Sequence, residues 1–179
     1  DSPVTNEELG VIYPRASMKK KEDEQYANEA RDITMRLQKG EKGLMALWKH
    51  IVDVSKAHAN KVYNYLNCTF DYSYGESNAA PYCDDVLNIL KEKGLAEESE
   101  GALIMHVKEE TDNKEMPPLM LVKSDGAILY DTTELATIYQ RMHDWNPDEI
   151  WYFTDERQSL HFEQAFRGVK KAGIVNEDT

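Results

Sequence analysis

The sequence has few cysteines, no long apolar run and fewer basic than acidic residues. Its two cysteines, Cys68 and Cys83, are too few for a disulfide framework and lack the spacing of a metal site, which indicates reduced, partly buried thiols. The longest apolar run is far shorter than the ~20 residues of a membrane span. The first ten residues are polar and acidic, without the basic start and apolar stretch of a signal peptide. We therefore expect a cytoplasmic protein that does not enter a membrane.

Basic residues are the scarcer charged class, because 21 lysines and arginines against 33 aspartates and glutamates give a formal net charge of −12. A face that binds nucleic acid needs clustered lysine and arginine, so this balance disfavours extensive phosphate binding. It leaves room for a local basic patch, or for a place beside more basic parts of a larger protein. An acidic chain also suits a cationic ligand.

The length of 179 residues suits one domain of ordinary size, and an apolar content of 41% can form a packed core. Residues 1–18 lack periodicity and contain two prolines, which predicts an irregular lead-in. Apolar residues at helical spacing predict helices over residues 19–39 and 43–67, separated by Gly40 as a left-handed terminator. These two helices would form a hairpin.

The apolar pattern then becomes mixed. We expect a short strand over residues 68–72, a helix over residues 81–93 and a strand over residues 101–107. Together with the helical hairpin, these elements would make residues 19–118 a mainly helical portion with a small, insertion-like α/β part.

The last sixty residues have the pattern of an α/β fold. The predicted elements are two strands joined by an Asp-Gly turn, then a helix, a strand and a helix, over residues 119–122, 127–130, 131–143, 150–153 and 158–172. The order β–α–β–α with short connections predicts parallel strands joined by a right-handed crossover within residues 119–179.

Polar residues gather where two of these strands would end. In an open parallel sheet, ligands bind at the carboxyl ends of the strands, where the strand-to-helix loops meet. Tyr130 and Glu134, one helical turn apart, could converge on a small ligand with Gln158 from the neighbouring loop. A carboxylate beside a phenol suits a planar cation, since a guanidinium offers paired donors that a carboxylate accepts. His161 lies near the start of the second helix and is a candidate neighbour of this pocket.

Each of these residues also has a purely structural interpretation. Asp131 and Glu134 have the spacing of a helix-capping box, in which Asp131 caps the helix and Glu134 reaches back. Tyr130 would then be the last core residue of its strand, Gln158 a solvated residue and His161 a packed or exposed side chain. Spacing alone favours the cap, so without further context these residues indicate an α/β domain with a polar pocket.

Several ordered segments resemble arginyl-tRNA synthetases. Residues 123–136, with the sequence KSDGAILYDTTELA, resemble the family stretch KSDGxxxYxTxDLA, and residues 150–162 resemble the next element, a strand that leads to RQxxHF. Upstream, the short sequences LQKG, ALW and GES fall in the order found in the family. The resemblance covers about residues 12 to 174, and the agreement of several segments is more specific than one short motif.

The resemblance implies a class I synthetase catalytic domain on a Rossmann-like sheet. In that family the tyrosine and the acid of the first loop and the glutamine of the second bind the substrate arginine, which corresponds here to Tyr130, Glu134 and Gln158. The family usually has aspartate where this chain has Glu134, a change that keeps the charge but moves it. The implied reaction is the activation of arginine by ATP with Mg²⁺ and its transfer to tRNA(Arg), with no catalytic nucleophile or metal ligand assigned in this chain.

Two nucleotide-site signatures of the family are missing. The sequence contains neither a HIGH-type nor a KMSKS-type motif, and these motifs stabilise the charge that develops on the phosphates of ATP. We therefore expect an internal fragment of the catalytic region that binds no ATP tightly and is inactive alone. Two other interpretations stay open: a non-catalytic module that kept an arginine pocket, and a structural α/β module whose polar loops bind nothing.

Overall fold

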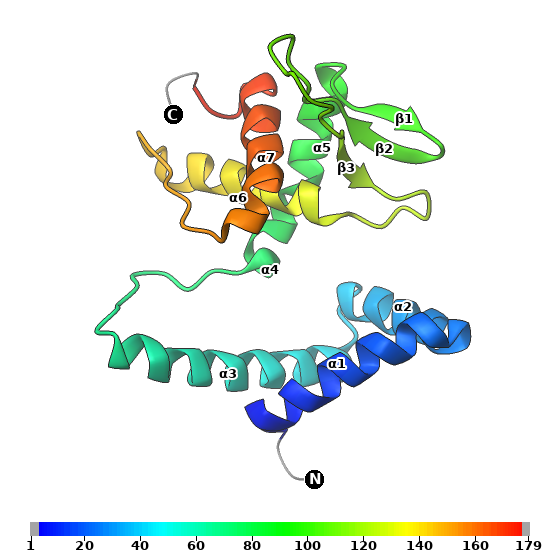
Figure 1. The fold of residues 1–179 in the computed structure, drawn as a ribbon, viewed down its shortest axis with the longest axis vertical. Coiled ribbons are helices and arrows are strands. Elements are labelled where there is room, and N and C mark those ends of the chain that lie inside the picture. Colours follow the sequence, from blue (N-terminus) through cyan, green and yellow to red (C-terminus); the bar gives the residue numbers. More distant parts are fainter. Residues whose placement is uncertain (1–3, 177–179) are drawn as a thin grey trace. The chain divides into compact units, whose positions relative to one another are not determined.

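The computed structural model describes residues 4–176, and the chain forms two compact units that divide near residue 71. Figure 1 follows the chain by colour, with the helices of the first unit in blue to cyan and the elements of the second in green to red. The first unit is helical, whereas the second combines helices with a small sheet.

Helix α1 spans Asn6–Glu22 and begins with a capping box. The Thr5 hydroxyl accepts a hydrogen bond from the Glu8 N–H (3.2 Å), and the Glu8 carboxylate accepts one from the Thr5 N–H (2.8 Å). Two backbone donors that a helix start would otherwise leave unpaired are thereby satisfied.

The expected irregular lead-in over residues 1–18 is therefore wrong. Pro14 lies inside α1, where it removes one backbone hydrogen bond without ending the helix, because the capping signal at Thr5 and the helical residues around it outweigh that loss. Residues 1–3 of the lead-in lie outside the described residues.

Helix α2 spans Glu24–Gln38 and α3 spans Lys42–Tyr65. The helix expected over residues 19–39 is divided because Asp23 ends α1 and caps α2, its carboxylate accepting a backbone N–H at 3.0 Å. Gly40 has a left-handed φ of +80°, which confirms it as the terminator between the two predicted helices.

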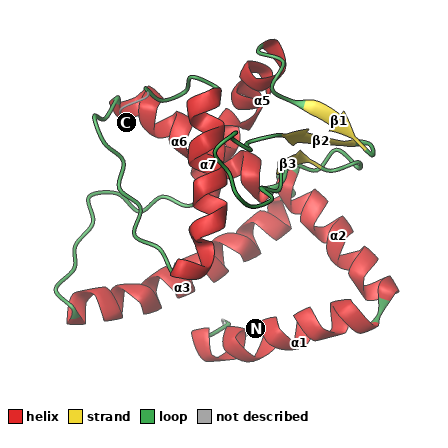
Figure 2. Cartoon of the chain, turned by 45° about the horizontal axis from the view of Figure 1, so that its top comes forward, coloured by secondary structure: helices red, strands yellow, loops and turns green. Residues whose placement is uncertain are grey.

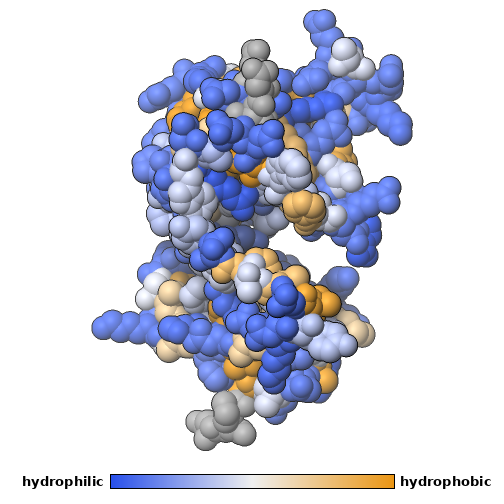
Figure 3. All heavy atoms as spheres, turned by 90° about the vertical axis from the view of Figure 1, so that its left-hand side faces the viewer, coloured by the Kyte–Doolittle hydropathy of each residue, from blue (hydrophilic) through white to orange (hydrophobic). Residues whose placement is uncertain are grey.

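The first unit has almost no core. Ala27 is the only buried residue among those described in its helices. Large apolar side chains are exposed instead, and Figure 3 shows orange, hydrophobic atoms at the surface. They are Val11, Ile12, Tyr13, Met18, Ile33, Met35, Met45, Leu47, Val62, Tyr63, Tyr65, Leu66 and Phe70.

The second unit joins short helices to a three-stranded sheet. Its elements are α4 (Glu76–Ala79), the 3-10 turn η1 (Ala80–Tyr82), α5 (Cys83–Glu92), β1 (Glu97–Ser99), β2 (Ala102–Met105), β3 (Leu119–Val122), α6 (Tyr130–Trp145), the 3-10 turn η2 (Glu156–Gln158) and α7 (Ser159–Lys171). The strands lie in the order β1, β2, β3, and both pairs are antiparallel. Figure 2 shows them in yellow beside the helices of this unit.

Helix α6 packs against α5, α7 and β3, and the core lies among these elements. Its largest fully buried side chains are Val86, Leu90, Met105, Val107, Leu119, Leu121, Leu135, Ile138 and Val169. Gly168 allows the close approach of α7, because a Cβ at this position would lie 2.9 Å from Leu119 Cδ1 and 3.1 Å from Leu135 Cδ2. The missing side chain at Gly168 thus sets how tightly α7 packs on β3 and α6.

The parallel β–α–β–α arrangement expected for residues 119–179 does not occur among the described residues. The Asp-Gly turn is confirmed, since Gly126 has a φ of +83° and its N–H donates to the carbonyl three residues earlier at 2.9 Å. Beyond this turn Ile128 forms one antiparallel bridge to Val122, and Tyr130 begins α6 instead of ending a strand.

Residues 68–72 and 150–153, both expected as strands, are irregular. An extended segment becomes a strand only when another segment pairs with its N–H and C=O groups, and no described segment does so here. The strand predictions for these two segments are therefore wrong for the described residues, because apolar and aromatic composition cannot supply a pairing partner. The helix expected over residues 81–93 is present as α5 after the turn η1, and the strand expected over residues 101–107 is present as β2.

Candidate functional site

The start of α6 is tied to strand β3 by two side chains. Asp131 Oδ2 accepts a hydrogen bond from the Met120 N–H (2.7 Å), and the Thr132 hydroxyl donates to the Leu121 carbonyl (2.8 Å). Thr132 is fully buried. These bonds fix the first turn of α6 on the sheet and so determine where the side chains of that turn lie.

The capping-box interpretation of Asp131 and Glu134 is wrong. Leu129 occupies the N-cap position of α6 and makes no side-chain cap, while Asp131 already lies within the helix. Because the Asp131 carboxylate is bonded to β3, the box is not formed and Glu134 has no capping role.

Glu134 is buried, with 8% of its surface exposed. Its carboxylate lies within interacting distance of two phenols, those of Tyr130 and Tyr152. Among the ion pairs of the described residues, none involves Glu134. Since a carboxylate removed from water costs free energy unless it is paired or hydrogen-bonded, a cation beside Glu134 would stabilise this part of the fold.

The pKa values of the two phenols are both raised. Burial is the largest cause for Tyr130 and Tyr152, and the negative charge of Glu134 adds to it. The Arg141 guanidinium opposes the rise in the pKa of Tyr152. Both hydroxyls therefore remain protonated at neutral pH and can donate hydrogen bonds to a carboxylate.

Tyr130 is 45% exposed at the first position of α6, one helical turn before Glu134. Its ring centroid lies 4.7 Å from that of His161 on α7. His161 Nδ1 is 3.5 Å from Asp131 Oδ1, and His161 Nε2 is buried without a hydrogen-bond partner in the part of the chain that the structure describes. His161 thus lies beside the first turn of α6, against Tyr130 and Asp131.

Gln158 is the last residue of η2 and is exposed. Asp155 caps this turn by accepting from the Arg157 N–H (3.0 Å), which leads the chain into α7 one residue after Gln158. Gln158 therefore precedes the helix that carries His161, but its expected convergence with Tyr130 and Glu134 stays a prediction.

Tyr152 and Arg141 are two residues of this region that the sequence reasoning missed. The Tyr152 hydroxyl accepts a hydrogen bond from Arg141 Nη1 at 2.5 Å, and the Arg141 guanidinium carbon lies 4.9 Å from the centroid of the Tyr152 ring. Both side chains also line an open hollow of about 460 Å³ beside residues 147–154. The sequence carried no signal for Tyr152, since residues 150–153 are all apolar or aromatic, and only the structure shows Ile150 and Tyr152 partly buried while Trp151 and Phe153 are exposed.

The described residues contain no cluster of three histidine, cysteine, aspartate or glutamate side chains that could hold a metal ion. In the same part of the chain, no helix combines the length and the apolar character needed to cross a membrane.

Comparison with known proteins identifies the family. The model of the catalytic domain of class I tRNA synthetases (R) matches residues 3–179. The arginine–tRNA ligase of Agathobacter rectalis is 48% identical over 179 residues, which are 100% of this chain and 30% of that protein. The arginine–tRNA ligase of Alkaliphilus oremlandii is 47% identical over 178 residues, with 99% of this chain and 30% of that protein covered.

A solved structure agrees with this assignment. The crystal structure of arginyl-tRNA synthetase from Plasmodium falciparum superposes with a TM-score of 0.73 at 29% sequence identity, over 87% of this chain and 27% of that one. The chain spans about 30% of the length of the curated relatives that it matches. With a family model that covers nearly every residue, the chain belongs to the class I tRNA synthetases for arginine and corresponds to part of their catalytic domain.

Proposed function

We propose that this chain is part of an arginine–tRNA ligase, which activates arginine with ATP and transfers it to tRNA(Arg), and that it forms one wall of the arginine site. The observation that carries the proposal is Glu134, a buried carboxylate with phenols around it and no ion pair among the described residues. In this role Glu134 binds the guanidinium of the substrate, while Tyr130 and Gln158 contact it from the two sides of the pocket.

The chemistry of Glu134 supports a guanidinium ligand over a simple ammonium. A guanidinium presents donors in a planar fork, and a carboxylate accepts two of them in parallel. Burial strengthens such a pair, because the surrounding medium screens charge less than water does. Glutamate stands where the family usually has aspartate, so here the carboxylate reaches the ligand from a Cα one methylene further away.

The chain's own contribution to the reaction is binding and orientation. The arginine carboxylate oxygen attacks the α-phosphorus of ATP and pyrophosphate leaves; a ribose hydroxyl of the tRNA then attacks the arginyl carbonyl carbon and AMP leaves. Neither step needs a covalent nucleophile from the protein, so rate enhancement comes from holding the reactants in line and stabilising charge. Held by its guanidinium, the substrate would present its carboxylate to the nucleotide.

In this proposal, ATP and Mg²⁺ are bound mainly by residues of the whole protein outside this chain. The sequence lacks both nucleotide-site signatures of the family, and the described residues contain no candidate metal cluster. Alone, the chain would therefore bind no ATP tightly and catalyse no ligation.

The finer fold assignment is also part of the proposal. Trp151 and Phe153 are 74% and 89% exposed, whereas Ile150 and Tyr152, which alternate with them, are partly buried. This alternation is that of a strand packed on one face only. We infer that residues 150–153 form a strand of a Rossmann-like parallel sheet in the whole protein, with neighbouring strands supplied by other segments.

The test is the substitution Glu134→Gln in the full-length ligase that carries this chain, assayed by aminoacylation of tRNA(Arg). Removing one charged partner of a hydrogen-bonded pair should raise the KM for arginine by about tenfold or more. Glu92→Gln, which removes the same charge from an exposed position of α5, is the matched control and should leave the KM unchanged. An unaltered arginine KM in Glu134→Gln would remove the pocket assignment.

A calorimetric titration separates the ligase from the two other interpretations. Arginine binding by full-length protein that lacks aminoacylation would indicate a module that kept the pocket without the ligation. Absence of arginine binding by a folded full-length protein would instead indicate a structural role.

A further inference from the structure

The hydroxyl of Tyr152 lies between an acid and a guanidinium of the same helix. It accepts from Arg141 Nη1 at 2.5 Å and lies within interacting distance of the Glu134 carboxylate. Arg141 and Glu134 both belong to α6, so Tyr152 is the contact through which the segment before α7 reaches both charged groups.

Both charges lie beside the same phenol, so removing the Tyr152 hydroxyl would leave the Arg141 guanidinium within reach of the Glu134 carboxylate. Arg141 follows Glu134 by seven residues, which places both on one face of the helix at a rise of roughly 10 Å. Long side chains on a helix point back toward its N-terminus, so the Arg141 side chain extends in the direction of Glu134. Arg141 carries a guanidinium, as the proposed substrate does, and could therefore pair with the Glu134 carboxylate in place of the substrate.

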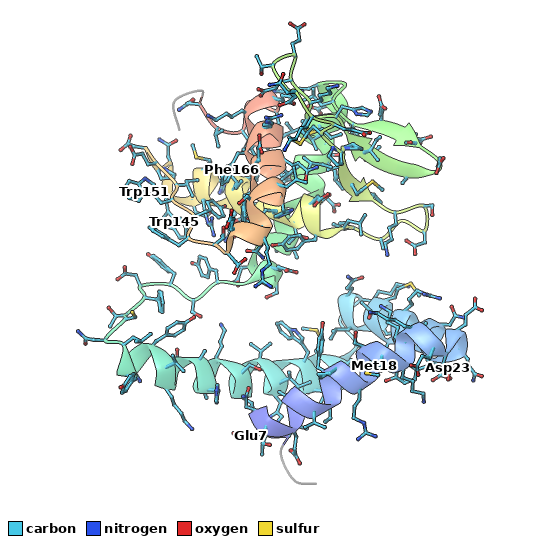
Figure 4. All side chains as sticks on the ribbon, in the orientation of Figure 1. Glu7, Met18, Asp23, Trp145, Trp151 and Phe166 are labelled. Atoms are coloured by element: carbon cyan, nitrogen blue, oxygen red, sulfur yellow. The ribbon has the colours of Figure 1, made fainter. Side chains whose placement is uncertain are left out.

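The ring of Tyr152 is fixed in place by its neighbours. Its centroid lies 5.0 Å from that of Phe162 and 5.2 Å from that of Phe166, both on α7. The Arg141 guanidinium covers the ring with its carbon 4.9 Å from the centroid. Figure 4 labels Phe166 on α7 and shows Trp151, the residue before Tyr152, pointing away from that helix.

We propose that Tyr152 is a positioning residue that holds Arg141 away from Glu134, so that the acid stays available to the guanidinium of the substrate. This inference rests on the proposed function of Glu134. Tyr152 binds Arg141 by its hydroxyl and by its ring face, and it offers its own O–H to the carboxylate in the absence of substrate. The phenol thus satisfies both charged groups without allowing them to pair.

The protonation state of Tyr152 agrees with this role. Burial and the charge of Glu134 raise the pKa of the phenol, so at neutral pH its hydroxyl can donate toward Glu134 while its oxygen accepts from Arg141. A phenylalanine at position 152 would keep the packing on Phe162 and Phe166 but could do neither.

The experiment uses Tyr152→Phe, Arg141→Gln and the double variant in the full-length ligase, with arginine KM and kcat measured separately. In Tyr152→Phe the released Arg141 competes with substrate for Glu134, which should raise the KM about tenfold with kcat changed less than about twofold. Arg141→Gln alone should keep the KM within about twofold of wild type, because Arg141 does not bind the substrate. In the double variant the competitor is absent, so the KM should return to within about threefold of wild type.

The rescue is the decisive result, since a phenol with a merely structural role would give a double variant at least as impaired as Tyr152→Phe. Tyr139→Phe, which removes the hydroxyl of a partly buried tyrosine elsewhere on α6, is the matched control. An unchanged KM in Tyr152→Phe, or no rescue by Arg141→Gln, would overturn the inference. A tenfold higher arginine KM in Arg141→Gln alone would also overturn the inference. This measurement can be made even if Tyr152→Phe does not fold.

The failure of this inference is distinguishable from failure of the proposed function. If Glu134→Gln raises the arginine KM while the Tyr152 and Arg141 variants behave otherwise than described, only the role of Tyr152 is wrong. If Glu134→Gln leaves the KM unchanged, the pocket assignment itself is wrong.

Discussion

The guanidinium of Arg167 on α7 binds both carboxylate oxygens of Asp112, with Nη1–Oδ2 and Nη2–Oδ1 distances of 2.6 and 2.9 Å. Asp112 lies in the connection between β2 and β3. Helix α7 also binds both ends of this connection. Lys171 Nζ donates to the carbonyls of residues 106 and 108 (3.3 and 3.1 Å), and Gln164 Nε2 donates to the carbonyl of residue 117 (2.6 Å). The helix that carries His161 at its start thus fixes this long connection along its length.

The Asp112–Arg167 pair should stabilise the connection in a pH-dependent way. The hydrogen bonds that the Asp112 carboxylate accepts from Arg167 are the main cause that lowers the pKa of Asp112 from 3.8 to about 2. A carboxyl whose folded pKa is depressed contributes stability above its unfolded pKa and loses it as the pH falls through the folded value. The contribution should therefore be complete above about pH 4 and disappear toward about pH 2.

Hydrogen exchange in residues 108–116 of full-length wild type and Asp112→Asn measures this contribution. Near neutral pH the variant should exchange faster in this segment, and the difference should begin to close as the pH falls below about 4. Glu115→Gln, an exposed acid of the same connection, should exchange like wild type throughout. A difference that stays constant down to low pH would contradict the assignment.

A side chain at position 168 should disturb the packing of α7. Leu119 and Leu135, which a Cβ would approach to 2.9 and 3.1 Å, are both fully buried and so have little room to move. Gly168→Val should lower the stability by about 1–3 kcal/mol through overpacking. Gly168→Ala should cost less, since alanine regains up to about 1 kcal/mol of helix propensity.

Thermal unfolding of the full-length protein checks this order, with wild type at least as stable as Gly168→Ala and Gly168→Val the least stable. Gly43→Ala on α3 is the control, because a Cβ there meets no atom within 4 Å. A valine variant as stable as wild type would show that α7 does not pack on β3 and α6 as described.

The Thr132 hydroxyl should matter for both stability and arginine binding. Thr132→Val keeps the shape but removes one of the two hydrogen bonds to the Leu121 carbonyl, which still accepts from the Leu129 N–H (3.0 Å), at a cost of about 0.5–1.5 kcal/mol. Because this bond ties the first turn of α6 to β3, its loss should also raise the arginine KM. Thr132→Ser, which retains the hydroxyl, should keep the KM near that of wild type. Equal arginine KM values in Thr132→Val and Thr132→Ser would show that this hydrogen bond does not affect the arginine site.

The features that the sequence predicted well depend on local signals. The helix expected over residues 43–67 is α3, Lys42–Tyr65, since its apolar spacing is continuous. Gly40 and Gly126 take left-handed backbone, as a terminator and a turn require. The capping box at Thr5 and Glu8 was equally local, yet two nearby prolines obscured it.

The features that it predicted poorly depend on partners far along the chain. Whether residues 150–153 pair as a strand is decided by another segment and not by their own composition. The spacing of Asp131 and Glu134 favoured a capping box, and only the bond from Asp131 to β3 excludes it. Tyr152 is 18 residues after Glu134, and no short-range pattern relates them.

The helices of the first unit bury a single side chain among the described residues, Ala27, and this limits how independently they can fold. Fixing a backbone costs roughly 1–2 kcal/mol per residue, which one small buried side chain cannot offset. Partly buried side chains such as Trp48, Ile51 and Val54 must therefore supply most of what holds these helices together. Substitutions that shorten these side chains should show in proteolytic sensitivity before they alter any kinetic constant.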